Sequence, residues 1–383
     1  MPNIIYLPYI ETLRRRIDAD SPLIQVVLGP RQVGKTTTIL KLIDDYYSRS
    51  AHYVSTDGIF NASPAWLREQ WLQAASERKI LFIDEIQKSE NWAETIKSLH
   101  DDSKRAKKRV PCVLLGSSSL QIQKGLSESL TGRFQLLRAH HWNFSESKQG
   151  YNLSFAQYIK FGGYPGSYPM VNTDEWADFV KNSIVATVID KDILLYQTVK
   201  SPALFKQAFE ILVNYPAQEV SYTKLLGQLQ DKGNVDLIKY YLSLYEGAYL
   251  IRALEKFSKT SHLKKGSSPN ILPLAPCLPY LQHRQEYTTD EEGRILELLV
   301  GAQLSRTDQE LYYWREGSYE VDYVLTSGKN VWAIEVKSGR KRSLQGLDRF
   351  KSKVPSCKQV LITKENYFDF ERDPLNFLEK MSL

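Results

Sequence analysis

A short stretch near the N-terminus, GPRQVGKTT at residues 29–37, combines residue types that suit the binding of phosphate. Its glycines allow backbone N–H groups to converge on phosphate oxygens, and the start of a following helix adds positive charge. In this spacing Lys35 is expected to reach the β- and γ-phosphates of ATP, and the Thr36 hydroxyl to ligate Mg²⁺. The predicted nucleotide-binding residues are Gly29, Pro30, Arg31, Gln32, Val33, Gly34, Lys35, Thr36 and Thr37. The alternative is a glycine-rich turn that binds nothing.

An acidic pair downstream supplies the groups that hydrolysis of a nucleotide needs. Asp84 and Glu85 directly follow the apolar run at residues 80–83, and the distance from the loop leaves room for one intervening strand. Asp84 is expected to hold Mg²⁺ through water, and Glu85 to polarise the attacking water. The alternative for this pair is a solvated strand end.

Two further side chains are candidates for the same reaction. Ser117 ends the apolar run VPCVLLG and is placed to sense the γ-phosphate or orient the water, unless it only forms a turn. Arg133, in SLTGRF, is predicted to lie on the lip of the same sheet. An arginine neutralises the charge that develops in phosphoryl transfer, and a neighbouring subunit can supply it. A surface salt bridge is the alternative for Arg133.

The elements that must position these residues are predicted from hydrophobic runs. The run LIQVVL before the loop, the run at 80–83 and the run ending at Ser117 are typical of buried parallel strands. The segment TTTILKLIDDYY after the loop has the pattern of a helix. Strands that alternate with helices predict an α/β fold with a parallel sheet, in which the loop follows the first strand.

Carboxylates near the C-terminus form a second candidate site. Glu297 lies on a predicted helix, and Asp322 and Glu335 lie on the two strands of a predicted hairpin joined by TSGKN. Alternation along a strand sends Glu335 and Lys337 to the same face. Asp322, Glu335 and Glu297 are the expected Mg²⁺ ligands. Lys337 is then expected to lower the pKa of the attacking water or to stabilise the phosphorus.

This helix and hairpin resemble the PD-(D/E)XK nuclease fold, which implies Mg²⁺-dependent cleavage of nucleic acid. The triplet E-x-K alone carries no such information, because Glu146-Ser147-Lys148 matches it in a different context. A fold of this kind can also persist without catalysis.

Two segments bear on whether DNA is a partner. Residues 219–257 are predicted to form helix, turn, helix and strand, the order of a winged helix, which either enters a DNA groove or serves as a spacer or protein contact. A basic run after the hairpin either tracks a phosphate backbone or is a solvated helix face. Its residues are Lys337, Arg340, Lys341, Arg342, Arg349, Lys351, Lys353 and Lys358.

The motifs GPRQVGKTT, LFIDEIQKSENWAETIKSLHD, LLGSSS, LTGR and FGGYPG, in this order, resemble the prokaryotic AAA-type ATPases that carry a C-terminal DUF4143 region. The order of elements at 219–257 predicts a winged-helix-like domain at 206–275, and the helix and hairpin predict a nuclease-like α/β domain at 276–383. The resemblance implies a P-loop NTPase core at 1–149, a helical lid at 150–205 and a DUF4143 region at 276–383. It also implies that Arg133 is an arginine finger and that the protein is a homo-oligomer. No counterpart of the sensor-2 arginine of this class can be placed.

Composition excludes several other classes of protein. The chain has 383 residues, a net charge of +6, 42% hydrophobic residues and only three scattered cysteines. No apolar stretch is long enough to cross a membrane, and the cysteines suit neither a disulfide framework nor a zinc site. We expect a cytoplasmic protein with ATP and Mg²⁺ as cofactors and no membrane partner. Three interpretations remain: an ATPase that cuts DNA, a nucleotide-gated oligomeric switch that binds DNA or protein without cleavage, and an interaction protein with a decayed ATP site.

Overall fold

The computed structural model describes residues 4–59, 62–117, 119–229, 233–258, 267–283, 285–339 and 344–382. The chain forms two compact units. Unit 1 consists of Met1–His141, Gln149–Tyr151 and Ile184–Gln197. Unit 2 consists of Trp142–Lys148, Asn152–Ser183 and Thr198–Leu383. The segment predicted as one lid, residues 150–205, is thus shared between the two units.

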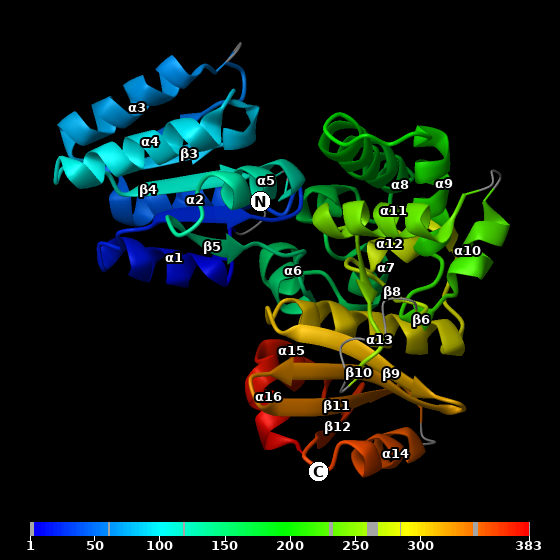
Figure 1. Cartoon of the computed structure of the whole chain (residues 1–383). Coiled ribbons are helices and arrows are strands. Elements are labelled where there is room, and N and C mark those ends of the chain that lie inside the picture. The colour runs from blue at the N-terminus through cyan, green and yellow to red at the C-terminus, as the bar shows by residue number, and fades with distance from the viewer. Residues whose placement is uncertain are drawn as a thin grey trace. The chain divides into compact units, whose positions relative to one another are not determined.

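A parallel sheet forms the centre of unit 1 (Figure 1). Its strands are β1 (Ile24–Leu28), β2 (Ala51–Ser55), β3 (Ile80–Asp84), β4 (Cys112–Gly116) and β5 (Phe134–Arg138). Their order in space is β2-β3-β4-β1-β5, and every neighbouring pair is parallel. The predicted α/β fold is therefore confirmed. The carboxyl ends of all five strands lie at one edge, where ligands bind in open α/β sheets.

Helices cover both faces of this sheet, with α3 and α4 on one side and α1 on the other (Figure 1). The helices are α1 (Tyr9–Asp18), α2 (Lys35–Leu42), α3 (Pro64–Glu77), α4 (Trp92–Arg105) and α5 (Ser119–Glu128). Val26 of β1 packs in one core with Trp71 of α3 and Ile96 of α4. All of β1 is buried, which explains why its sequence is a continuous apolar run rather than an alternating one.

Unit 2 contains a small antiparallel sheet, and three helices precede or separate its strands along the sequence. These elements are α9 (Pro202–Leu212), β6 (Gln218–Glu219), α10 (Tyr222–Gln228), α11 (Val235–Gly247), β7 (Ile251–Leu254) and β8 (Asn270–Pro273). The predicted order of helix, turn, helix and strand is present at α10, α11 and β7. Tyr241 and Tyr245 of α11 are fully buried, and Tyr245 stacks on Phe205 at 4.4 Å between ring centroids. These two tyrosines therefore contribute packing, whereas Tyr240 is 37% exposed.

A second, four-stranded sheet follows in unit 2, in the order β12-β11-β10-β9. Its strands are β9 (Glu310–Glu316), β10 (Tyr319–Ser327), β11 (Asn330–Lys337) and β12 (Lys358–Thr363). The predicted hairpin is β10–β11, with Ser327 opposite Asn330. The other helices of the unit are α6 (Phe144–Tyr151), which begins in it, α7 (Phe155–Phe161), α8 (Glu175–Asp178), α12 (Cys277–His283), α13 (Thr289–Ser305), α14 (Gln345–Lys353), α15 (Tyr367–Arg372) and α16 (Pro374–Lys380). No helix in the described part of the chain is long and apolar enough to span a membrane.

A buried carboxylate holds the first turn of α6. Glu371 is 1% exposed and accepts hydrogen bonds from the backbone N–H groups of Phe144 (2.9 Å) and Ser145 (3.0 Å). It also accepts from the Ser145 hydroxyl (2.6 Å) and the Tyr367 hydroxyl (3.0 Å). Four donors are thereby satisfied in the interior, two of them helix N–H groups that have no partner within the helix.

We predict that Glu371→Ala lowers the free energy of unfolding of unit 2 by about 3 kcal/mol, because the change strands several buried donors. Urea denaturation followed by circular dichroism measures this. The matched control is Glu379→Ala, since Glu379 bonds Lys358 at the surface with 46% of its side chain exposed. That change is expected to alter stability by less than about 0.5 kcal/mol. Equal effects of the two substitutions would show that the Glu371 contacts contribute nothing.

Candidate functional site

The loop at 29–36 follows β1 directly and leads into α2, at the carboxyl edge of the parallel sheet. Gly29 packs so closely that a Cβ there would lie 2.4 Å from the Ala139 carbonyl oxygen, so only glycine fits. Gly34, just before α2, has a φ of +83°, which favours glycine for a different reason. Lys35 is buried, and its amine donates to the carbonyl oxygens of Gly29 (3.0 Å) and Pro30 (2.6 Å). Burial lowers the pKa of Lys35 to about 8, against the opposing effect of nearby Glu85 and Asp84.

Asp84, at the end of β3, links the loop to the neighbouring strands. Its Oδ2 accepts hydrogen bonds from the Thr36 hydroxyl (2.6 Å) and the Tyr53 hydroxyl (3.0 Å). Its Oδ1 accepts from the backbone N–H of Glu85 (2.9 Å). Burial first, and then the charge of Asp84, raise the pKa of Tyr53, which therefore stays a neutral donor. The predicted Mg²⁺ ligands Thr36 and Asp84 thus lie together, and Tyr53 is a contact that sequence reasoning missed.

Glu85 is held in an unusual conformation beside them. Its φ is +51°, in the left-handed region that non-glycine residues rarely adopt. The Glu85 Oε2 accepts hydrogen bonds from the Ser117 hydroxyl (2.9 Å) and the Gln87 side-chain amide (2.5 Å). Strained backbone of this kind concentrates at functional sites. Ser117 therefore contacts Glu85, and Gln87, two residues further along the DEIQ stretch, is a second partner that the sequence did not single out.

The remaining loop residues divide by exposure. Val33 is fully buried, whereas Gln32 and Thr37 are exposed, and Gln32 has a φ of +56°. Arg31 forms a two-pronged ion pair with Asp192, with its Nε 2.6 Å and its Nη2 2.5 Å from the carboxylate oxygens. Asp192 is a third residue that sequence reasoning missed.

Arg133 lies at the opposite edge of the sheet, which corrects the prediction that it shares the lip with the loop. Phe134 begins β5 opposite Ile24, the first residue of β1, while the loop follows Leu28. At about 3.3 Å per residue the two edges of the sheet are roughly 17 Å apart. The physical reason is that Arg133 precedes a parallel strand, and residues before such a strand lie at its amino end.

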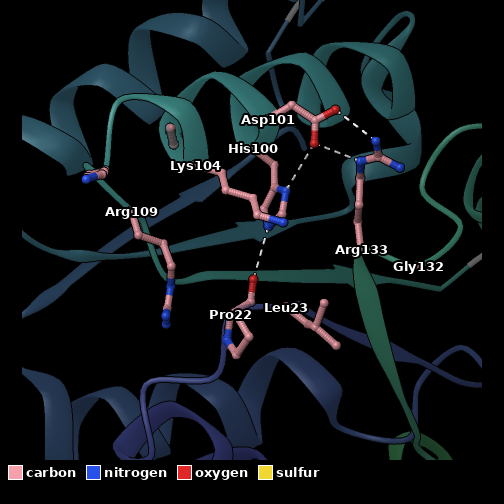
Figure 2. A pocket seen from close by; sticks show the side chains of 10 residues that line it. Pro22, Leu23, His100, Asp101, Lys104, Arg109, Gly132 and Arg133 are labelled. Carbon is pink, nitrogen blue, oxygen red and sulfur yellow. Dashed lines mark hydrogen bonds and ion pairs between the residues drawn. The ribbon is translucent and has the colours of Figure 1, made fainter.

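At that edge Arg133 lines a pocket of about 560 Å³ that Figure 2 shows. Its guanidinium pairs with both oxygens of Asp101, each at 2.9 Å, and its side chain is 32% exposed. The cations Lys104, Lys107 and Arg109 line the same pocket. Within a single chain Arg133 therefore forms a surface salt bridge, which was the alternative for this residue. Its role as an arginine finger stays a prediction.

Asp322 of β10 and Glu335 of β11 lie on neighbouring strands of the second sheet, whereas Glu297 lies on α13. The Asp322 Oδ2 accepts a hydrogen bond from the Val336 N–H at 2.7 Å. This bond crosses the hairpin at the residue that follows Glu335. The Lys337 amine lies 2.5 Å from the Glu335 Oε1, whereas the buried Glu335 Oε2 has no hydrogen-bond partner. Across the described ranges, no three histidine, cysteine or acidic side chains converge as a metal site, which corrects the prediction that Asp322, Glu335 and Glu297 form one Mg²⁺ site.

Crowding of these carboxylates shifts their titration. Burial, only partly offset by the charge of Lys337, raises the pKa of Glu297 to about 7. Burial, Glu335 and Glu297 raise the pKa of Asp322 well above its usual range. Burial also raises the pKa of Glu335, against the hydrogen bond with Lys337. These carboxyl groups thus retain protons to a higher pH than free carboxyl groups do, and the charge of Lys337 only partly offsets this.

The basic run beyond the hairpin is partly neutralised by acids. Arg349 and Lys353 both bond Glu316, and Lys358 bonds Glu379. Arg340, Lys341 and Arg342 lie outside the described residues. The described part of the run therefore has the character of a paired, solvated surface.

The parallel sheet and the loop after its first strand have the fold of P-loop NTPases. Residues 21–148 match the family model described as an AAA domain, residues 152–271 match a domain of unknown function, DUF8612, and residues 292–378 match a domain of unknown function, DUF4143. The chain thus carries an AAA domain followed by a DUF4143 region, as its motifs predict. The nuclease-like character of that region stays a prediction.

Known proteins resemble the chain over most of its length. An uncharacterized protein of Methanocaldococcus jannaschii is 25% identical over 340 residues, which are 82% of this chain and 74% of that protein. A Walker-type ATPase of Pyrococcus abyssi has a similar structure, with a TM-score of 0.50 and 13% identity, over 73% of this chain and 96% of that one. At this identity the likeness concerns the fold alone.

Proposed function

We propose that unit 1 binds ATP with Mg²⁺ and hydrolyses it. The observation that carries this proposal is the contact of 2.6 Å between the Thr36 hydroxyl and the Asp84 carboxylate, beside the buried amine of Lys35. A loop that presents N–H groups and a lysine suits the phosphates, and the two oxygens suit a hard cation. The intact set argues against a decayed ATP site.

The donor set fits Mg²⁺. Both groups next to the loop are oxygens, and Mg²⁺ is bound in nucleotide sites by few protein oxygens together with phosphates and water. Thr36 and Asp84 would hold the ion, which neutralises charge on the phosphates when it is bound. Tyr53 keeps the Asp84 carboxylate oriented toward Thr36 through its hydrogen bond of 3.0 Å.

Glu85 is the residue that positions the attacking water and accepts its proton. Its Oε2 is held by Ser117 and Gln87, so the carboxylate has a fixed direction before any substrate arrives. A base held in this way contributes to the reaction without having to be ordered first. Ser117 therefore acts as a positioning residue for Glu85.

We predict that Glu85→Gln retains ATP binding and lowers kcat by about 10²-fold or more, because an amide cannot accept the proton. Lys35→Ala is expected to abolish binding. Calorimetry with Mg²⁺ and ATP, and release of phosphate, measure the two effects. Equal rates of hydrolysis in Glu85→Gln and the parent would remove Glu85 from the mechanism, and unchanged affinity in Lys35→Ala would remove the loop.

Arg133 serves the ATP site of a neighbouring subunit in this proposal. The separation of the two sheet edges prevents it from reaching the phosphates bound by its own chain. Its exposed position in a pocket with other cations suits an approach by the phosphates of a second copy. Asp101 holds the guanidinium until then, so an oligomer is needed for full activity.

We predict that Arg133→Ala binds ATP normally and hydrolyses it more slowly, on the order of 10³-fold. Mixing it with Glu85→Gln chains should restore activity, because some sites then combine an intact Glu85 with a neighbour's intact Arg133. Arg105→Ala is the control, since Arg105 pairs with Asp102 on the same helix with 77% of its side chain exposed. If mixing restores nothing, the arginine does not act between subunits.

A second candidate activity is metal-dependent cleavage of nucleic acid by unit 2. The buried, unpartnered Glu335 Oε2 favours it, because an oxygen in that state lacks a cation or donor. Asp322 and Glu335 would hold a divalent ion, which activates water when bound, whereas Glu297 does not complete a three-residue site with them in the described structure. Lys337 then donates to the phosphate instead of to Glu335. Binding of DNA through α11 and the basic run, without cleavage, is the alternative.

We predict that the protein cuts DNA or RNA with Mg²⁺ or Mn²⁺, and that Lys337→Ala slows cutting by about 10²-fold or more. Labelled single- and double-stranded substrates, incubated with and without ATP, measure this. Lys364→Ala is the control, since Lys364 pairs with Glu292 at the surface. Cutting that persists in Lys337→Ala would indicate a contaminant, and no cutting by the parent would leave the binding alternative.

A further inference from the structure

The ion pair between Arg31 and Asp192 joins the phosphate loop to a distant part of the chain. The two residues are 161 positions apart, yet both belong to unit 1. Asp192 is nearly covered, with 6% of its side chain exposed, and the Arg31 side chain is 24% exposed. The guanidinium uses both prongs on one carboxylate, the geometry in which arginine binds carboxylates and phosphates alike.

Asp192 lies on the π-helix at Val188–Leu194. Ile189 and Ile193 of this helix are buried, with 3% and 0% exposure, so the segment is packed and not loosely attached. It falls outside the stretch that matches the AAA domain and inside the stretch that matches DUF8612. A residue outside the AAA domain therefore holds a side chain of the nucleotide loop.

We propose that Asp192 senses the γ-phosphate, because it competes with the bound nucleotide for Arg31. This inference rests on the proposed ATP site. A triphosphate offers the guanidinium the same two-pronged contact that Asp192 offers, with more negative charge than a diphosphate. When Arg31 turns to the phosphate, the helix at Val188–Leu194 loses its tie to the loop.

The charges around the loop support a competition. Arg31 lies four residues before Lys35 in the loop, and the charges of both Arg31 and Asp192 act on the Lys35 amine, which is expected to reach the β- and γ-phosphates. While Arg31 is paired with Asp192, its charge is not available to the phosphates. Once Arg31 turns to the phosphates, the Asp192 carboxylate has lost its partner and repels them. Both effects oppose the nucleotide. In this arrangement the arginine lies on the phosphate loop and the acid lies on the helix at Val188–Leu194.

Linkage fixes the direction of the test. If ATP weakens the Arg31–Asp192 pair, removal of the pair must strengthen ATP binding by the same factor. In a Glu85→Gln background, which prevents turnover, we expect Asp192→Asn to tighten ATP binding by about fivefold or more, the lower end of typical couplings. ADP binding should change less. Calorimetry with Mg²⁺ measures both affinities.

Two further variants separate competition from a general charge effect. Asp190→Asn removes an exposed acid from the same helix and should leave the ATP affinity within about twofold, as expected for a screened surface charge. In Arg31→Gln, adding Asp192→Asn should strengthen ATP binding by less than it does when Arg31 is present, because only the repulsion by the carboxylate is then removed. Hydrogen exchange of residues 184–197 should be faster with ATP than with ADP in the Glu85→Gln chain, and this difference should vanish in Asp192→Asn.

Weaker or unchanged ATP binding in Asp192→Asn would overturn the proposal, and so would an equal gain in Asp190→Asn. Exchange in residues 184–197 that does not differ between ATP and ADP would also overturn it, even if Asp192→Asn were poorly folded. A chain that binds no ATP at all, in which Lys35→Ala changes nothing, would instead show that the proposed function itself is wrong.

Discussion

A buried amine at the carboxyl edge of a parallel sheet is the constraint on which the rest of unit 1 depends. Lys35 has little water around it, so its charge must be stabilised by the loop carbonyls and by acids nearby. Burial of a charge is costly unless it is paired and hydrogen-bonded. The residues around this amine are Gly29, which packs against Ala139, Asp84 at the end of β3 and the strained Glu85. The two acids lie near the Lys35 charge, and the glycine allows the loop to approach the sheet closely.

The same constraint explains why so many side chains near the loop hold one another. Thr36 and Tyr53 bond Asp84, and Ser117 and Gln87 bond Glu85. Each acid thus has a defined direction without a ligand. In a water-poor site, hydrogen bonds that are already formed reduce the reorganisation that a reaction requires. Order at this edge is therefore built by Tyr53 of β2, by residues at or just after the ends of β3 and β4, and by Thr36 at the start of α2.

The sequence was sufficient for the parts of this site that are local in the chain. The loop, its flanking strand and the acid pair are contiguous motifs, and a parallel sheet places them at one edge. It was not sufficient for Asp192, because a contact across 161 residues leaves no local pattern. The predicted position of Arg133 was wrong, and the reason is related. Which edge it occupies depends on the direction of β5 beside β1, and this pairing is non-local.

The two E-x-K triplets show how environment decides what the same residues do. Glu146 caps the first turn of α6 together with Asn143 and bonds Arg306 at 3.0 Å, so its oxygens are satisfied. Glu335 has one oxygen against Lys337 and one with no partner, beside acids whose pKa values burial raises. A satisfied carboxylate stabilises a fold, whereas one left short of donors in a crowded acid cluster is suited to a cation. The triplet at residues 335–337 is therefore the one that keeps an unpartnered carboxylate oxygen, and its neighbour Asp322 comes from the hairpin rather than from the spacing of the triplet.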